Sequence, residues 1–234
     1  MKFENTEVWG FEHALRGMRN PKNSWNKSDS YYDDNNNFVI GENDMKLAQS
    51  LIKAGSEHRK FMRQIFVSAD ITAPLYWWKE FDTYKVGTVA NSTSTMHKLA
   101  TTPITIDCFE TDDYDGSLQV FDREPYNPDE TLSECVTEII DICETLRKRY
   151  LETNDKKYWK ELIRWLPESW LQKRTVTMDY ENLLAICGKG QRRFHKLNEW
   201  SGQDNPNVPN FISWARTLPY AQELIFIDEL LDKK

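Results

Sequence analysis

KRTVTMDYENLLAIC, residues 173–187, joins two different hydrophobic patterns. KRTVTM (173–178) is rich in side chains that favour β-structure and predicts a strand. YENLLAIC (180–187) has the spacing of a short helix, and Gly188 follows it as a stop signal. A strand that runs directly into a helix indicates a chain of the α+β class.

Amphipathic helices account for most of the other predicted structure. The segment 41–55 predicts a helix that Asn43 or Asp44 caps and Gly55 ends. A helix is also expected from Thr72 through LYWWKEFDTYK, with Pro74 in its first turn. Further helices are predicted at 131–152, 155–166 and 219–231, a second strand at 61–67, and surface loops near 20–40 and 102–130.

Composition limits the classes of protein to which the chain can belong. Of its 234 residues, 39% are hydrophobic and 13% aromatic, which excludes a disordered chain. A net charge of −7 argues against a long nucleic acid as the partner. Since no apolar run reaches about 18 residues, we expect no membrane span and a soluble, cytoplasmic protein.

Metal and disulfide chemistry have little support in the sequence. The four cysteines form no CxxC pair, and the four histidines form no HxH, HExxH or similar spacing. Reduced thiols are the favoured interpretation over metal or disulfide roles. We therefore predict no metal site.

Two polar segments could contact a phosphate group, and each has a structural alternative. NSTST (91–95) offers hydroxyl groups to a phosphate, or caps the helix that follows it. GKGQRR (188–193) combines glycine with positive charge, but it follows a helix, so Gly188 is favoured as a C-cap. Both interpretations stay open for Arg192 and Arg193.

An aromatic series follows the predicted strand. Its members are Tyr76, Trp77, Trp78, Phe81 and Tyr84. These rings could stack on a base, form a subunit interface, or serve only as helical core.

Taken in order, these segments resemble the flavin-dependent thymidylate synthase family. Members carry a helix ending in Gly, an EH pair, a strand, a helix leading into RHRxxSxNxxSxRY, then NxRxLxxFxxxR and a final helix. The corresponding segments here are LIKAG (51–55), EH (57–58), FMRQIFV (61–67), DITAPLYWWKEF (70–81), VANSTSTMH (89–97), RTVTMDYENLLAI (174–186) and PYAQELI (219–225).

The departures from the family pattern fall on its cationic positions. The RHR triplet would lie near Phe81 to Val86, where Lys85 is the only cation. Asp179 and Glu181 occupy the Asn and Arg places of NxRxLxxF. Guanidinium groups suit phosphate because they give planar, bidentate donors. Each lost charged hydrogen bond should cost about 1.5–3 kcal/mol, so FAD and dUMP should bind poorly unless other cations replace them.

The length of 234 residues suits a single domain or two small ones, and we expect a single domain over residues 1–234. The resemblance implies a central antiparallel sheet flanked by helices. It also implies a homotetramer with shared sites, and FAD as cofactor. By the same analogy NADPH supplies the reducing equivalent, and dUMP is methylated with carbon from methylenetetrahydrofolate.

The resemblance also suggests site residues, although it assigns no catalytic one. His58, Asn91 and Lys85 are expected to bind the cofactor. Asn91 and Ser94 match the motif, whereas Ser92 stands where many members have Glu. The nucleotide is expected at Ser92, Ser94, Arg192 and Arg193. Arg59, Lys60 and Arg63 are the other cations that could replace the missing arginines.

Two hypotheses about function follow. In the first, the chain is a divergent synthase-like protein that binds a nucleotide or flavin, with dUMP methylation altered or lost. In the second, it is a non-catalytic protein that captures a nucleotide or a protein partner, and it is encoded by a phage or mobile element.

Overall fold

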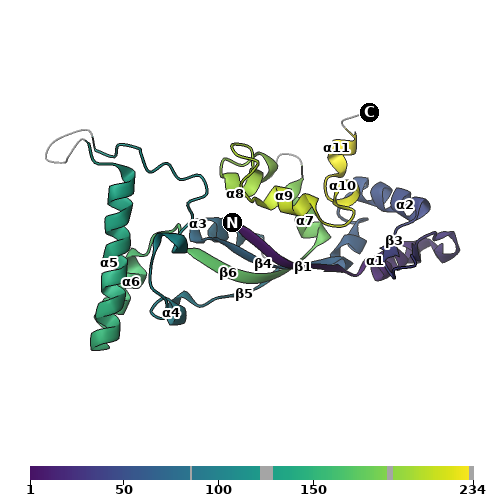
Figure 1. Ribbon diagram of the computed structural model, residues 1–234. Helices are drawn as coiled ribbons and strands as arrows, with labels where there is room; N and C mark the ends of the chain where they lie inside the picture. Colours follow the sequence, from purple (N-terminus) through teal and green to yellow (C-terminus); the bar gives the residue numbers. More distant parts are fainter. Residues whose placement is uncertain (85, 122–128, 189–191, 232–234) are drawn as a thin grey trace. The chain divides into compact units, whose positions relative to one another are not determined.

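A four-stranded antiparallel sheet, flanked by helices, organises the fold (Figure 1). The computed structural model describes residues 1–84, 86–121, 129–188 and 192–231. The sheet has the strand order β1-β4-β6-β5. The strands are β1 (Lys2–Trp9), β4 (Phe66–Pro74), β6 (Leu171–Asp179) and β5 (Val89–Ser92). The predicted α+β class with a central antiparallel sheet is confirmed.

The inner strands β4 and β6 place alternate side chains in the core. In β4 every second residue from Val67 to Ala73 is buried, as expected for one covered face of a sheet. The predicted strand 173–178 is confirmed and extends to 171–179 as β6. Its buried apolar residues are Val176 and Met178.

Two predictions near β4 are wrong in their boundaries. The segment 61–67 is mostly the 3-10 helix η3 (Lys60–Gln64), which buries Phe61 and Met62, because a short apolar run fits a helical turn as well as a strand. Thr72 and Pro74 end β4 instead of starting a helix. The helix that follows is α3 (Leu75–Phe81).

The chain divides into two compact units that alternate along the sequence. Unit 1 comprises Met1, Thr72–Glu80 and Ser92–Arg174. Unit 2 comprises Lys2–Ile71, Phe81–Asn91 and Thr175–Lys234. A single domain over 1–234 stays a prediction.

Unit 1 is built around a pair of helices. These are α5 (Leu132–Thr153) and α6 (Lys156–Trp165), which confirm the helices predicted at 131–152 and 155–166. The segment between 95 and 121 contributes α4 (Thr95–Lys98) and the 3-10 helix η4 (Ile106–Cys108). The core consists of Leu99, Ile104, Phe109, Cys143 and Leu162.

Unit 2 contains the remaining helices. The predicted helix 180–187 is confirmed as α7 with Gly188 as its C-cap, whereas 219–231 is two short helices instead of one. Tyr220 has a left-handed φ of 55°, so the first of these begins only after it. The helices are α1 (Phe11–Arg19), α2 (Glu42–Lys53), α7 (Tyr180–Cys187), α8 (Asn198–Ser201), α9 (Phe211–Arg216), α10 (Ala221–Leu224), α11 (Ile227–Leu231) and the 3-10 helix η5 (Arg192–Phe194).

None of the described helices combines the length and the apolar composition needed to cross a bilayer.

Asp44 in α2 fixes the predicted surface loop near 20–40. This loop contains η1 (Asn20–Lys22), η2 (Trp25–Lys27) and the hairpin β2 (Tyr31–Tyr32) with β3 (Phe38–Val39). The fully buried Asp44 carboxylate accepts hydrogen bonds of 2.6 Å from Arg19 Nε and from the hydroxyls of Ser28 and Ser30. One side chain therefore joins α1, the loop and α2.

The cap of α2 differs from the prediction. Gly41 is the N-cap residue, and the carboxylate of Asp29 accepts from the backbone N–H groups of Asn43 and Asp44. The capping carboxylate comes from the loop, so the local motif could not identify it.

We expect Asp44→Ala to lower the free energy of unfolding by about 3–5 kcal/mol, because it leaves the buried Arg19 guanidinium without its carboxylate. Burial alone raises the pKa of Asp44, but the hydrogen bonds from Ser28, Ser30 and Arg19 outweigh it and hold the pKa below its usual value. The measurement is urea denaturation at pH 7. The control Glu42→Ala removes an exposed carboxylate of the same helix and should cost no more than about 1 kcal/mol. Equal losses from the two variants would contradict the role of Asp44.

Candidate functional site

The segment 89–97 forms the outer strand β5 and the start of α4. Asn91 and Ser92 are exposed on β5. Ser94 is the N-cap of α4: its Oγ accepts from the backbone N–H of His97 at 3.2 Å and lies 2.7 Å from His97 Nδ1. The N-cap interpretation is thus confirmed. A nucleotide contact by Ser92 or Ser94 stays a prediction.

His58 lies just after α2 at a pocket of unit 2, which we call the His58 pocket. Its volume is about 740 Å³. His58 is exposed, and its backbone N–H donates to Gly55 O at 3.0 Å. The other polar residues that line the pocket are Asn20, Lys22, Ser24, Ser50, Glu57, Lys60 and Gln64, so two lysines face one carboxylate. Apolar lining comes from Met18, Leu47, Leu51 and Phe61. The pocket thus combines apolar walls with convergent polar groups, as ligand sites commonly do.

Lys60 is the one cation named by the resemblance that lines the His58 pocket within the described residues. Its ammonium group lies 4.0 Å from Glu57, and both side chains are largely exposed. Such an exposed pair holds its lysine weakly. Lys60 is therefore free to turn toward an anion.

Arg59 does not line the His58 pocket and forms an ion pair with Glu181. Its Nε lies 2.9 Å from both carboxylate oxygens of Glu181. By the resemblance in sequence, Glu181 corresponds to an arginine of the family pattern. The Glu181 carboxylate therefore neutralises the positive charge of Arg59.

Arg192 lies against aromatic rings. Its Nε donates to the Tyr84 hydroxyl at 3.0 Å, and its guanidinium lies 4.9 Å from the centre of the Trp200 ring. Trp200 is fully buried and stacks with Phe81. These contacts place Arg192 at the edge of the aromatic core, and its predicted nucleotide contact stays untested.

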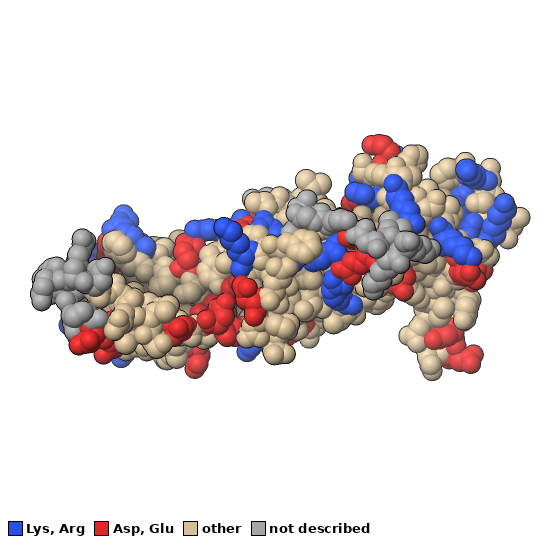
Figure 2. Space-filling model, turned by 90° about the horizontal axis from the view of Figure 1, so that it is seen from above, with Lys and Arg blue, Asp and Glu red and all other residues tan. Residues whose placement is uncertain are grey.

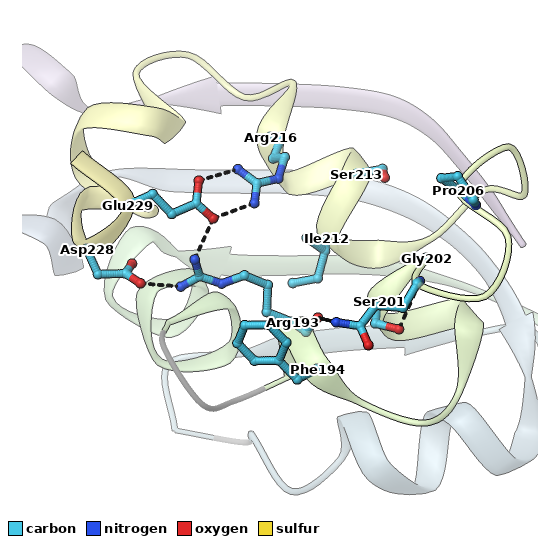
Figure 3. A pocket seen from close by; sticks show the side chains of 11 residues that line it. Arg193, Phe194, Ser201, Gly202, Pro206, Ile212, Ser213, Arg216, Asp228 and Glu229 are labelled. Carbon is cyan, nitrogen blue, oxygen red and sulfur yellow. Dashed lines mark hydrogen bonds and ion pairs between the residues drawn. The ribbon is translucent and has the colours of Figure 1, made fainter. Parts of the chain in front are cut away.

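The pocket that contains Arg193 has no net positive charge (Figure 3). Its volume is about 630 Å³. The Arg193 guanidinium is almost completely buried and pairs with Asp228 and Glu229 of α11. Arg216 of α9 pairs with the same Glu229 through two hydrogen bonds of 2.6 and 2.9 Å. Two guanidinium groups and two carboxylates balance, so this pocket offers a phosphate no net positive charge. A nucleotide contact by Arg193 stays a prediction.

Glu229 is the carboxylate on which both guanidinium groups converge. Hydrogen bonds from Arg216 outweigh the opposing effect of burial, and further bonds from Arg193 and Gln222 add to them, so the pKa of Glu229 falls to about 2. The ionised carboxylate ties α11 to α9 and to η5, so its first effect is structural.

Protonation of Glu229 at low pH should break its ion pairs with Arg193 and Arg216. A carboxylate with a lowered pKa stabilises the fold above its unfolded pKa, and that contribution is lost as the pH falls. We expect Glu229→Gln to be less stable than the wild type at pH 7 by on the order of 2 kcal/mol, and the difference to vanish between pH 4.5 and about 2. Urea midpoints at pH 7, 4.5 and 3 measure this. Glu223→Gln, on neighbouring α10 and without an ion pair among the described residues, is the control. A pH-independent difference would refute the assignment.

The aromatic series divides between burial and partial exposure. Trp77, Trp78 and Phe81 are almost completely buried, which confirms helical core as their role. Tyr76 and Tyr84 are half-buried.

Of the three residues assigned to a flavin by resemblance, the two that the structure describes do not fit its diphosphate. His58 and Asn91 are exposed and bring no permanent charge, and Lys85 lies outside the described residues. Arg193 and Arg216 already have carboxylate partners that would repel a diphosphate. We therefore derive no reaction step through FAD.

The described part of the chain contains no cluster of metal ligands. No group of three or more His, Cys, Asp or Glu side chains is placed to hold an ion there. All four cysteines are free thiols: Cys143 and Cys187 are buried, and Cys108 and Cys135 are half-buried. Burial raises the pKa of the Cys143 thiol, which makes it a poor nucleophile.

Sequence reasoning did not identify two features of these sites. Lys22 of the His58 pocket belongs to NPKNSWNK (20–27), which has the composition of an ordinary polar loop, although lysines spaced among amide and hydroxyl side chains were a usable signal. Asp228 and Glu229 belong to a segment predicted only as an amphipathic helix. Their pairing with Arg193 depends on the tertiary fold.

Comparison with known proteins gives a structural likeness without a sequence match. No model of a protein family matches the sequence, and no curated protein is similar to it. The fold is similar to that of the flavin-dependent thymidylate synthase ThyX from Helicobacter pylori, solved with FAD and dUMP, at 14% identity and a TM-score of 0.62. That match covers 97% of this chain and 99% of the other.

A second similar structure is the UMP/dUMP methylase PolB from Streptomyces cacaoi, bound with 5-Br dUMP. Its TM-score is 0.57 at 14% identity, covering 97% of this chain and 94% of that one. The predicted resemblance to the thymidylate synthase fold is confirmed. At this level of identity the likeness establishes the fold.

Proposed function

We propose that this chain is a divergent protein of the ThyX fold that binds a pyrimidine nucleotide and has lost dUMP methylation. The observation that carries the proposal is the fold shared along 97% of the chain with two structures that hold dUMP or its bromo analogue. Because a fold does not by itself imply function, the residues of a pocket must also suit the nucleotide.

The charge distribution supports a loss of methylation. The place of the RHR triplet holds no arginine, and Glu181 stands at another arginine place and binds Arg59. Reduction and methyl transfer need flavin and dUMP held in contact. Losing two or three charged hydrogen bonds lowers affinity by several powers of ten.

The His58 pocket is the proposed place of the nucleotide. Phe61, Met18 and Leu47 offer apolar surface to the base. Lys60 and Lys22 offer positive charge to the phosphate, and His58 a ring nitrogen to a ribose or phosphate oxygen.

Equilibrium dialysis with radiolabelled UMP and dUMP tests the binding. We expect Lys60→Glu to weaken binding roughly 10-fold, because it reverses a charge in the pocket. Lys46→Glu is the control, since Lys46 is exposed on α2 and lines neither this pocket nor that of Arg193. Purified protein should be colourless after incubation with FAD, and mass spectrometry should find no dTMP from dUMP, NADPH, FAD and methylenetetrahydrofolate. Formation of dTMP would overturn the loss of methylation, and absence of nucleotide binding would overturn the function.

Association with further copies of the chain is a second part of the proposal. Of the 22 residues of α5 only Cys143 and Arg147 are buried. Ile139 and Ile142 are 42% and 56% exposed, and Trp165 of α6 is 65% exposed. A long helix with so little buried surface and exposed isoleucines supports an interface between copies. By the same resemblance we propose a cytoplasmic homotetramer.

Light scattering after gel filtration tests the assembly. We expect Ile142→Glu to dissociate the oligomer, because a carboxylate would be buried in an apolar interface. The control Thr137→Glu adds the same charge about 140° around the helix. A wild-type monomer, or equal dissociation by both variants, would refute this interface.

A further inference from the structure

A second pocket of unit 2 adjoins the His58 pocket. Lys22, Ser24 and Leu47 line both, so the two pockets share a wall. The second pocket has a volume of about 730 Å³ and is otherwise lined by Arg19, Asn23, Asn26, Lys27 and Asn43. We call it the Lys27 pocket. The nucleotide proposed above occupies only the His58 pocket and leaves the Lys27 pocket without a ligand.

The Lys27 pocket differs from the Arg193 pocket in its electrostatics. No Asp or Glu is among the residues that line it. Arg19 is compensated by Asp44, but Lys22 and Lys27 form no ion pair with any carboxylate in the described ranges. Figure 2 shows several Lys and Arg side chains, together with Asp and Glu side chains, on the part of unit 2 that carries α1 and α2. An anion therefore finds uncompensated charge here.

The pocket also offers neutral donors. Asn23, Asn26 and Asn43 contribute side-chain amides and Ser24 a hydroxyl. Ammonium groups interleaved with amide and hydroxyl donors suit an oligophosphate, which has many acceptor oxygens and no donor at neutral pH.

The backbone that carries these donors is held in place. Ser24 N–H donates to Arg19 O at 3.2 Å, and Lys27 N–H to Ser24 O at 3.1 Å. Trp25 Nε1 donates to Asn20 Oδ1 at 2.9 Å, and the Asp44 carboxylate fixes the end of the loop. A segment already ordered loses less entropy on binding.

We propose that the Lys27 pocket binds the terminal phosphates of a nucleoside di- or triphosphate whose nucleoside occupies the His58 pocket. This inference rests on the proposed function and specifies its ligand class. The ligand is then a pyrimidine nucleoside polyphosphate, and Lys22 at the shared wall contacts the phosphate chain midway. Free oligophosphate has the same chemistry and is the alternative source.

Calorimetric titration of the full chain with UMP, UTP and inorganic tripolyphosphate tests the inference. We expect UTP to bind about 10-fold more tightly than UMP, and this ratio to shrink as salt rises, because solvent-exposed charge pairs are screened. In Lys27→Gln the ratio should fall toward one. Lys53→Gln, which removes an exposed lysine of α2 that lines neither pocket, should retain it.

The outcomes separate the inference from the proposed function. Equal affinity for UMP and UTP overturns the subsite and leaves the function standing. Binding of tripolyphosphate without either nucleotide supports an anion site and overturns the nucleotide function. Failure of all three to bind overturns both. Equal loss of the ratio in Lys27→Gln and Lys53→Gln shows a general charge effect and overturns the subsite.

Discussion

A buried guanidinium must meet a carboxylate, and this constraint governs much of the structure. Arg19 meets Asp44, Arg147 meets Glu144, and Arg193 meets Asp228 and Glu229. Leaving any of these charges unpaired away from water would be costly. These three arginines therefore serve the fold, and the positive charge left for a ligand in the two proposed pockets comes from Lys22, Lys27 and Lys60.

This division explains why the thymidylate synthase fold is recognisable while its usual ligand chemistry is not. Apolar side chains of the sheet and helices need only pattern and volume, which many sequences satisfy. A diphosphate site needs guanidinium groups at fixed places. At 14% identity the first requirement is met. The resemblance in sequence puts Glu181 at one of the arginine places of the family pattern, and this is the basis for our proposal that the second is not met. Nucleotide capture by lysines is compatible with both observations.

The sequence predicted the elements whose signals are local and long. The helices at 131–152 and 155–166 and the strand at 173–178 have repeating apolar positions, and the structure contains all three. It could not predict the cap of α2, since Asp29 reaches it from another segment, nor the break at Tyr220. The EH pair of the sequence drew attention to His58, which lines a pocket in the structure, and Lys60 lines the same pocket. Arg193 was singled out by its charge, whereas its carboxylate partners come from a distant helix.

The contact between Arg59 and Glu181 has an evolutionary consequence. Glu181→Arg alone, which would match the family pattern, would set two guanidinium groups face to face where Arg59 Nε now donates to both carboxylate oxygens of Glu181. The single reversion is penalised before any phosphate is bound, so a second change at Arg59 must come first or together with it. The ion pair thus couples positions 59 and 181, so a change of sign at one of them is tolerated only with a change at the other.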